Sequence, residues 1–428
     1  MNKNTLIAIG GKSGSGKTTL ASALIKCFPT VYERPKSCTT RSKRSGENDE
    51  EYNFISHDEF VRFSECDEFL NIDYVYGNYY AIKTQSITDV IASGKIPIKE
   101  IHPQNHAKIR ELFNGTVLSV LVKSSLAPST NTDRAQQDNT YYDSINEDEF
   151  DIVFFYDIDL SPERNAYYFH QKIRTTLIYE GIFPPSGIID ALNREGYEKV
   201  ANDFTEEKRI TTRNFHELSA PFFRDSFAAY VTENAAVAEI GPGQGWLYRT
   251  VAPKCRSYVG FDISSAMVNT DQIINKIISS VRCTNSRAEM YDAVVASLSD
   301  PYFYPEAICE IARILKESGY FIFSIPSNAW ASAFRKDKNS RNKTSFLLDS
   351  GEMAQVFSFA SPESDVDLLL RNCGFEKILF KQETGARLIG HEISPAIITA
   401  ASSLDKDITE LGIITTAIYR KKGVYNYE

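Results

Sequence analysis

The chain has 428 residues, a length typical of two or three domains of ordinary size. Hydrophobic residues make up 42% and charged residues 24% of it, which excludes a disordered chain, and the lack of a long apolar run excludes a membrane-spanning segment. The net charge of −9 argues against a long nucleic acid as partner, because a protein that neutralises many phosphates needs a basic face.

The N-terminal segment, the cysteines and the histidines bear on location and metal binding. MNKNTLIAIGGK enters an expected strand directly and lacks the pattern of a signal peptide. The seven cysteines are scattered and form no CxxC pair, so we expect reduced thiols and a cytoplasmic protein. His102 and His106 are four residues apart, but no third ligand accompanies them. We interpret them as polar positions at a strand end and a helix start.

Strand and helix signals alternate along the first half. Short apolar runs predict strands at 5–10, 96–101, 116–122 and 150–157, and the stretch 18–28 reads as a helix. Helical patterns separate most of the strands, which is typical of a parallel sheet covered by helices. The polar stretch 124–149 is expected to be a mobile loop.

The second half repeats this alternation after a Pro- and Gly-rich boundary at 181–187 and an amphipathic helix over 191–209. Strands are predicted at 235–240, 257–263, 291–298 and 320–326, with a helix at 305–317. The segment 411–421 is expected to be a final antiparallel strand.

The first glycine-rich loop, GGKSGSGKTT, follows the strand at 5–10 and precedes a helix. It satisfies the pattern G-x-x-x-x-G-K-[ST], in which backbone N–H groups turn toward phosphate oxygens. Lys17 is expected to reach the β- and γ-phosphates of ATP and to assist catalysis, and the Thr18 hydroxyl to bind Mg²⁺. The ATP-binding residues are expected to be Gly11, Ser13, Gly14, Ser15, Gly16, Lys17, Thr18 and Thr19.

The segment SCTTRSKRSGENDEEYNFIS at 37–56 resembles the nucleotide-monophosphate site of guanylate kinases, and the resemblance covers residues 4 to about 178. The matching residues are Ser37, Arg41, Arg44, Gly46, Glu47, Tyr52 and Phe54. Two arginines three residues apart, together with a tyrosine hydroxyl, can hold a phosphate dianion as a fork. GNYY at 77–80 continues the match, and Tyr80 falls where the family has a phosphate-contacting tyrosine.

The chain departs from the guanylate kinase pattern where that family reads the base. Asn71 stands at the base-reading glutamate, and Glu100 and His102 stand at the acids of an L-D-x-D strand. A carboxylate accepts both N–H donors of guanine, whereas an asparagine offers one acceptor and one donor. We therefore expect the acceptor to be a small phosphorylated molecule, a nucleotide or nucleotide-like metabolite that need not be GMP, bound by Asn71 and Glu100.

The lid is a second departure. Guanylate kinases carry several arginines there to neutralise the transferring phosphoryl group, whereas 124–149 contains only Arg134. We assign Arg134 to this role beside Lys17 and Mg²⁺, with simple solvation of the side chain as the alternative.

The second glycine-rich loop, VAEIGPGQG at 237–245, resembles the first motif of class I S-adenosylmethionine-dependent methyltransferases, and the resemblance covers roughly 192–428. It implies that Gly241, Gly243 and Gly245 let the backbone approach the cofactor and that Glu239 fixes its amino end. Asp262 ends the next strand and would accept both ribose hydroxyls. The family usually has a second acid for adenine between Asp262 and Tyr291, and no residue is assigned to it.

These patterns predict an α/β protein of two domains. The first, 1–182, is a P-loop kinase domain with a parallel sheet and helices on both faces; 183–191 is a linker; and 192–428 is a Rossmann-like class I methyltransferase domain. ATP, Mg²⁺ and S-adenosylmethionine are the expected cofactors, and one metabolite visiting both sites would explain the fusion. Alternatives are a kinase and methyltransferase of RNA ends, or a methyltransferase with a non-catalytic guanylate kinase-like binding module. Tyr302, Tyr304 and Trp246 lie near the expected methyl-acceptor pocket.

Overall fold

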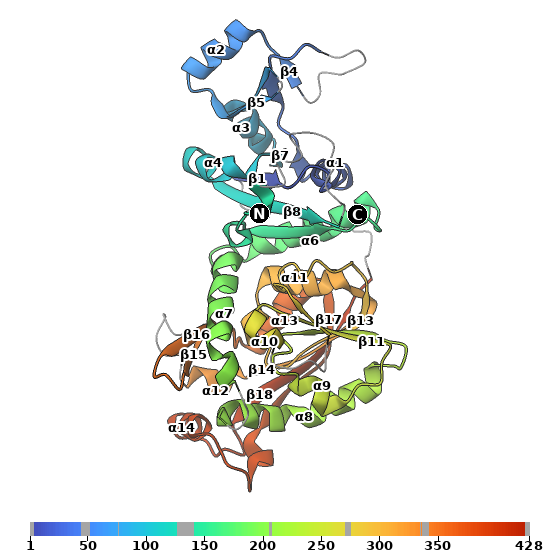
Figure 1. Ribbon diagram of the computed structural model, residues 1–428, viewed down its shortest axis with the longest axis vertical. Coiled ribbons are helices and arrows are strands. Elements are labelled where there is room, and N and C mark those ends of the chain that lie inside the picture. Colours follow the sequence, from blue (N-terminus) through green and yellow to red (C-terminus); the bar gives the residue numbers. More distant parts are fainter. Residues whose placement is uncertain are drawn as a thin grey trace. The chain divides into compact units, whose positions relative to one another are not determined.

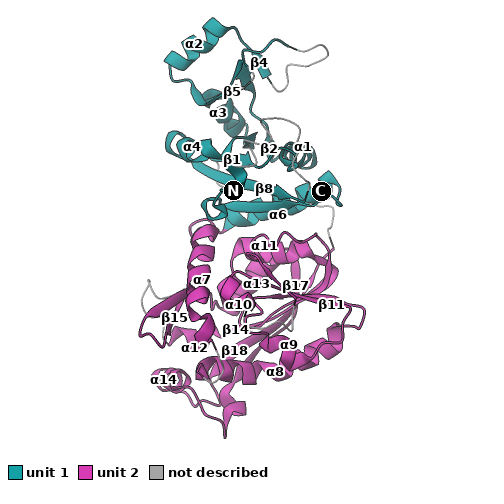
Figure 2. Ribbon diagram, in the orientation of Figure 1, with its two compact units in different colours: residues 1–178 teal, residues 179–428 magenta. Residues whose placement is uncertain are grey.

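The computed structural model describes residues 4–43, 52–75, 77–125, 141–204, 208–269, 275–333, 335 and 342–423. The chain divides into two compact units, residues 1–178 and 179–428, coloured separately in Figure 2. Arg44, Gly46, Glu47 and Arg134 lie outside the described residues. Within the described part, no helix has the length and apolar character needed to cross a membrane.

Unit 1, residues 1–178, is built on a five-stranded sheet in the order β2-β7-β1-β8-β9, with every neighbouring pair parallel. Its strands are β1 (Thr5–Gly10), β2 (Tyr32–Glu33), β7 (Ile96–Glu100), β8 (Thr116–Ser124) and β9 (Ile152–Tyr156). The predicted strands of the first half are therefore confirmed. All six residues of β1 are buried, as expected of a parallel strand covered on both faces.

The helices of unit 1 cover both faces of this sheet (Figure 1). They are α1 (Lys17–Cys27), α3 (Thr84–Ala92), α4 (His106–Leu112) and α6 (Pro162–Ile178). On one face, Leu6 and Ala8 of β1 lie in a core cluster with Ile87 of α3 and Ile109 of α4. Side chains alternate along a strand, so Ile7 and Ile9 are buried on the opposite face.

A second, four-stranded sheet in the order β4-β3-β6-β5 was not anticipated from the sequence. Its strands are β3 (Ser37–Thr39), β4 (Tyr52–Phe54), β5 (Phe69–Val75) and β6 (Asn78–Lys83). Helix α2 (His57–Glu65) begins at a capping box in which the Ser56 hydroxyl accepts from the Glu59 amide and Glu59 accepts from the Ser56 amide. Four of the residues predicted to bind the acceptor lie on this sheet: Ser37, Tyr52, Asn71 and Tyr80.

The boundary between the units differs from the predicted linker at 183–191. Residues 186–191 form the first turns of helix α7 (Ser186–Val200), and Ile189 lies in the core of unit 2. Pro184 and Pro185 directly precede this helix, and Pro185 stands at its N-cap position.

Unit 2, residues 179–428, contains a seven-stranded sheet in the order β12-β11-β10-β13-β14-β18-β17. The strands are β10 (Ala236–Ile240), β11 (Ser257–Asp262), β12 (Asn275–Ile278), β13 (Tyr291–Ala296), β14 (Leu315–Pro326), β17 (Phe375–Thr384) and β18 (Gly412–Lys421). The predicted final antiparallel strand is confirmed, since β18 runs antiparallel to both β14 and β17. The helix expected at 305–317 ends three residues earlier, because Leu315 already begins β14.

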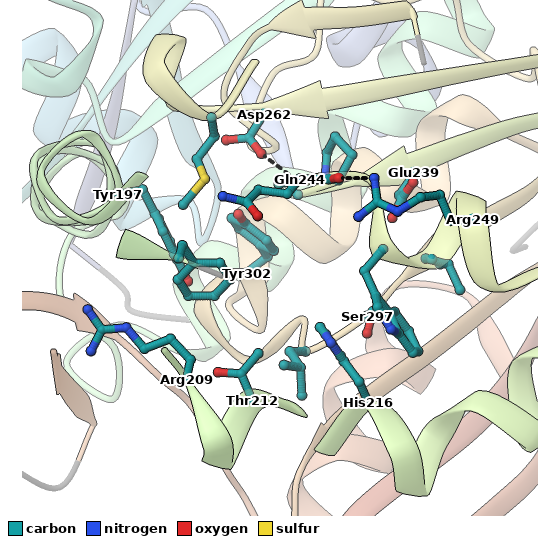
Figure 3. Close-up of a pocket in the computed structure, with 18 residues that line it drawn as sticks. Tyr197, Arg209, Thr212, His216, Glu239, Gln244, Arg249, Asp262, Ser297 and Tyr302 are labelled. Carbon is teal, nitrogen blue, oxygen red and sulfur yellow. Dashed lines mark hydrogen bonds between the residues drawn. The ribbon is translucent and has the colours of Figure 1, made fainter. Parts of the chain in front are cut away.

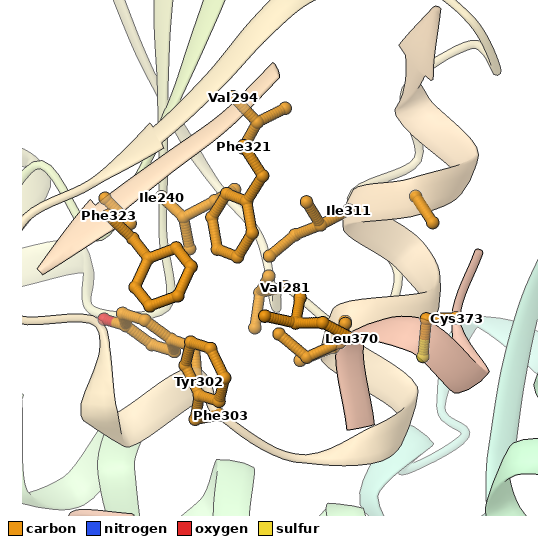
Figure 4. Packing of buried hydrophobic residues seen from close by; sticks show 14 of the residues in the cluster. Ile240, Val281, Val294, Tyr302, Phe303, Ile311, Phe321, Phe323, Leu370 and Cys373 are labelled. Atoms are coloured by element: carbon orange, nitrogen blue, oxygen red, sulfur yellow. The ribbon is translucent and has the colours of Figure 1, made fainter. Parts of the chain in front are cut away.

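Helices cover both faces of the unit 2 sheet as well (Figure 1). They are α8 (Ile210–Tyr230), α9 (Trp246–Val251), α10 (Ser265–Asn269), α11 (Pro305–Ile314), α12 (Asn328–Ser332), α13 (Glu363–Asn372) and α14 (Pro395–Ser403), and a hairpin of β15 (Lys343–Leu347) and β16 (Met353–Phe357) adds a small sheet. On one face Phe321 and Phe323 pack with Ile311 of α11 and Leu370 of α13 (Figure 4). Ile322, between those two phenylalanines, faces α8 on the other side.

Candidate active sites

The P-loop of unit 1 connects the end of β1 to the start of α1. Gly14 and Gly16 have left-handed backbone angles, with φ of +81° and +83°, and Lys17 is the first residue of α1. Lys17 Nζ donates to the carbonyl of Lys12 at 3.0 Å, which holds its amine over the loop. The Ser15 hydroxyl oxygen is buried and has no hydrogen-bond partner among the described residues. An oxygen-rich anion at the helix start fits this set of donors.

A cavity of about 350 Å³ lies beside the P-loop. Lys12, Ser13 and Ser15 line it, with Tyr142 and Asp143 from the segment that follows the undescribed part of the lid. The Tyr142 hydroxyl accepts from the Gly11 amide at 3.2 Å, and Lys12 Nζ lies 2.5 Å from Asp143 Oδ1. The lid end and the phosphate-binding loop are therefore in direct contact.

A second cavity of unit 1, about 240 Å³, brings together residues that are far apart in the sequence. It is lined by Thr18, Arg34, Ser37, Tyr52, Asp73, Tyr80, Ala81, Ile82, Lys99 and Glu100. Thr18 comes from the P-loop helix and Glu100 from the main sheet, whereas Ser37, Tyr52 and Tyr80 come from the small sheet. Five of the predicted site residues thus share one cavity.

Three charged residues of this cavity, Arg34, Asp73 and Lys99, were missed by the sequence reasoning. Arg34 Nη2 lies 2.8 Å from Glu100 Oε1 in a half-buried ion pair. Asp73 is two residues beyond Asn71 on β5, and its carboxylate accepts from Asn71 Nδ2 at 2.8 Å and from Asn105 Nδ2 at 3.1 Å. Asn71 itself does not line the cavity. Side chains two residues apart on a strand lie on the same face of the sheet. The prediction of Asn71 as a site residue could therefore have indicated Asp73 as another candidate.

Arg41 lies against the aromatic residues of β4. Its guanidinium carbon is 5.3 Å from the ring centre of Tyr52 and 5.2 Å from that of Phe54. Stacking on aromatic faces holds a guanidinium without consuming all its donors.

The histidine pair is structural. His106 is buried, and its ring nitrogens lie 2.6 Å from the Ser119 hydroxyl and 3.1 Å from the Ile101 carbonyl. Burial lowers the pKa of His106 to about 4. The side chain of His102 caps the short helix that starts at Pro103. Both positions are as interpreted from the sequence, and no cluster suited to a metal ion occurs among the described residues.

In unit 2 the second glycine loop connects β10 to α9. Gly241, Gly243 and Gly245 all have positive φ, and Gly245 caps α9. A Cβ atom at Gly241 would lie 2.6 Å from the Tyr302 ring, so only glycine lets the loop approach that ring. Figure 3 shows the pocket, with Asp262 on one side of Tyr302 and Arg209 and Thr212 on the other.

Two predicted acids line this pocket, and both are buried. Glu239 Oε2 accepts from the Tyr258 hydroxyl at 2.8 Å, and burial raises its pKa to about 7. Asp262 accepts from the amides of Gly243 at 3.1 Å and Ser264 at 3.0 Å, and burial raises its pKa to about 6. Burial disfavours the ionised forms of both carboxylates, and a cation beside them would favour those forms again.

The pocket also contains residues that no motif indicated. They are Tyr197, Arg209, Thr212 and His216, from α7 and the start of α8, together with Ser297 beyond β13. The imidazole of His216 stacks on Trp246 at 3.9 Å between ring centres. Of the three aromatic residues expected near the pocket, Trp246 and Tyr302 line it, whereas Tyr304 is fully buried and donates to Asp190.

Comparison with known proteins assigns the two units separately. A family described as guanylate kinase matches residues 2–152, and one described as methyltransferase domain matches residues 238–323. The guanylate kinase of Wolinella succinogenes is 34% identical over 122 residues, which are 28% of this chain and 56% of the relative. The guanylate kinase of Halalkalibacterium halodurans is 40% identical over 126 residues, which are 29% of this chain and 61% of the relative.

The chain therefore spans a little more than half the length of these curated relatives. Among solved structures, a putative S-adenosylmethionine-dependent methyltransferase from Listeria monocytogenes is 16% identical, with a TM-score of 0.35, over 48% of this chain and 100% of the other. The two family matches alone support the conclusion that this chain has a guanylate kinase-like domain in its N-terminal part and a methyltransferase-like domain in its C-terminal part.

Proposed function

We propose that unit 1 transfers the γ-phosphoryl group of ATP to the phosphate of a small phosphorylated molecule. The observation that carries this proposal is the position of the P-loop between two cavities. Lys12, Ser13 and Ser15 face one cavity, and Thr18 faces the other, in which Ser37, Tyr52 and Tyr80 lie. A donor and an acceptor bound in these two cavities would meet at the same loop, and phosphoryl transfer depends mainly on such positioning.

The residues of unit 1 have distinct roles in this proposal. The loop amides and the Ser15 hydroxyl bind phosphate oxygens and Lys17 neutralises their charge. Thr18 would hold Mg²⁺, which would supply further positive charge against the phosphates. Arg41, Tyr52 and Tyr80 grip the acceptor phosphate, with Ser37 at the edge of the cavity. The rest of the acceptor contacts the carboxylates of Asp73 and Glu100. Arg44 and Arg134 keep the roles proposed from the sequence.

For unit 2 we propose methyl transfer from S-adenosylmethionine to a small molecule. Glu239 binds the ammonium group of the cofactor, and Asp262 accepts from its ribose hydroxyls. The three glycines let the protein backbone approach the cofactor closely. The bound cofactor supplies an activated methyl group, so the protein mainly has to align the acceptor. We expect reduced cysteines and a cytoplasmic location, because the seven cysteines are scattered along the sequence and form no CxxC pair. A metabolite that uses both sites in turn would account for the fusion.

Calorimetric melting of the full chain with ATP and Mg²⁺, and with a panel of nucleoside monophosphates and sugar phosphates, tests the first activity. We expect one phosphorylated compound to raise the melting temperature of wild type and to be phosphorylated. Arg41→Ala should abolish both effects, whereas Arg62→Ala, on the exposed helix α2, should change neither. Binding of ATP without any turnover would instead favour a non-catalytic module, and binding of RNA with a steep salt dependence would favour an RNA end as acceptor.

A further inference from the structure

A cavity of about 430 Å³ in unit 2 adjoins the pocket at the second glycine loop. The two spaces share Tyr197, Phe204, Arg209, Thr212 and Leu298 in their walls. The larger one extends away from Glu239 and Asp262 toward the β15–β16 hairpin and the start of α14. A molecule in it would therefore sit next to whatever occupies the glycine-loop pocket.

The walls of this larger cavity are aromatic on several sides. Phe204, Phe215, Trp330 and Phe346 line it, together with Tyr197. Phe215 and Trp330 stand edge to face with 5.0 Å between ring centres, and Phe204 and Phe346 do so at 5.9 Å. Such walls favour a flat, largely apolar ring over a flexible polar chain.

Asp300 is the only acid among the described residues that line this cavity. Its side chain is largely buried, and its Oδ2 accepts from the Ser358 hydroxyl. Arg335 donates to the Ser358 hydroxyl at 2.5 Å and to the Ser358 carbonyl at 2.6 Å, so a cation supports Asp300 through one serine. Lys208, at the exposed edge, is already paired with Asp203 and Asp349.

We propose that this cavity holds the methyl acceptor, a planar ring compound with a hydroxyl or ring N–H group, and that Asp300 accepts the proton of that group. This inference rests on the methyl transfer proposed above. In the step, the acceptor oxygen or nitrogen forms a bond to the methyl carbon while the bond from that carbon to sulfur breaks. The proton leaves with Asp300 and then passes to water, so charge and atoms balance.

The surroundings of Asp300 suit a general base. Burial raises its pKa to about 6, while Ser358 and Arg335 oppose this rise. The carboxylate is therefore mostly ionised at neutral pH, and its pKa is near the working pH, as a general base requires. The other titratable groups that act on it are Tyr197 of α7, Tyr302 beside it and Arg335 after α12. The tyrosine pKa values are raised, so near neutrality both stay uncharged.

The test compares two probes that differ by one hydroxyl. Full-length protein saturated with S-adenosylhomocysteine is titrated with para-cresol and with toluene by calorimetry, at about pH 7.5, where the cresol hydroxyl stays protonated. We expect wild type to bind para-cresol about tenfold or more tightly than toluene, because a charge-assisted hydrogen bond forms only with the former. Asp300→Asn should remove this preference and leave toluene binding unchanged.

Two further variants keep the test decisive. Ser358→Ala keeps the Asp300 carboxylate but removes the hydroxyl that donates to it. This variant should reduce the preference for para-cresol without abolishing it, and it tests the proposal even if Asp300→Asn does not fold. Asp365→Asn, in the exposed first turn of α13 and outside the walls of this cavity, serves as the matched control and should behave as wild type. Equal affinity of wild type for both probes, or no binding of either, would overturn the assignment. Failure of S-adenosylhomocysteine to bind wild type would instead overturn the proposed methyl transfer itself.

Discussion

Asp190 and Arg282 form an ion pair in unit 2, with 2.9 Å between Oδ2 and Nε, and each side chain is only 2% exposed. Asp190 also accepts from the Tyr304 hydroxyl at 2.7 Å and from Ser280, and Arg282 donates to the Ser186 hydroxyl at 3.2 Å. The pair ties the first turns of α7 to the segment after β12. It explains why residues expected to be a linker are fixed parts of the methyltransferase domain.

Removing Asp190 should destabilise unit 2 severely. Asp190→Ala removes the carboxylate that pairs with the buried guanidinium of Arg282, and breaking comparable buried pairs costs about 3–5 kcal/mol. Urea unfolding followed by tryptophan fluorescence measures this, since both tryptophans of the chain, Trp246 and Trp330, belong to unit 2. Glu195→Ala, on the same helix, breaks an exposed pair with Lys199 and should leave the midpoint nearly unchanged. Equal effects of the two substitutions would contradict this account.

Gly14 and Gly16 provide a matched pair in the P-loop. Their φ angles are nearly equal, so alanine at either position pays a similar backbone cost of about 1–2 kcal/mol. A Cβ at Gly16 would also lie 2.8 Å from the Tyr156 ring, whereas a Cβ at Gly14 meets nothing within 4 Å. We expect Gly16→Ala to weaken both the thermal stability of unit 1 and its binding of ATP much more than Gly14→Ala. Scanning calorimetry with and without ATP compares them, and similar losses would show that the contact with Tyr156 is unimportant.

The two units should respond to acid in opposite directions. In unit 1, burial lowers the pKa of His106 and of His170 to about 4, so the unfolded chain takes up these protons first and stability falls as the pH drops from about 6.5 to about 4. In unit 2, burial raises the pKa of Glu239 to about 7 and of Asp262 and Asp300 to about 6. The folded state then binds protons first, and stability rises as the pH drops from about 7 to about 4.5.

Urea midpoints between these pH values measure both responses. Tryptophan fluorescence reports the unfolding of unit 2. The change in circular dichroism that does not coincide with the fluorescence change reports the unfolding of unit 1. Glu239→Gln should flatten the response of unit 2 and leave that of unit 1 unchanged. Midpoints that move together in both units would disprove the assignment of these groups.

Binding of S-adenosylmethionine should tighten as the pH rises. The proposed contact pairs its ammonium group with ionised Glu239, and for a group with a pKa of about 7 the ionised fraction increases about tenfold between about pH 6 and pH 8. Calorimetry in two buffers of different ionisation heat gives both the affinity and the number of protons released. Glu239→Gln should weaken the binding of S-adenosylmethionine at pH 8 and remove most of the pH dependence of its affinity. A pH-independent affinity in wild type would argue against an ionic contact at Glu239.

Sequence reasoning located the parts of the sites that depend on local chain geometry. The glycines of both loops, Lys17, Thr18 and Asp262 follow from a strand, a tight turn and a helix in succession, and such spacing is visible in one sequence. The main strands were recognisable for the same reason, since their apolar runs are continuous.

The remaining parts of the sites depend on contacts between distant segments. Arg34 lies between β2 and β3 and Asp73 lies on β5, yet both line one cavity, and nothing in the sequence near either residue indicates that they meet. Asp300 became a candidate only when Ser358, Arg335 and the β15–β16 hairpin were seen around it. Side chains whose partners lie far away in the sequence form no short motif from which their role could be predicted.

Strand β18 lies between β14 and β17, although β17 precedes it in the chain. During synthesis, β17 therefore emerges from the ribosome before the strand that must separate it from β14, and it cannot take its final place until β18 has been made. The kinase domain faces no such delay, because its sheet is complete once β9 has emerged. The nascent chain would thus carry a complete first sheet while the second sheet still exposes the edge of β14, and an unpaired strand edge is prone to pair with other chains.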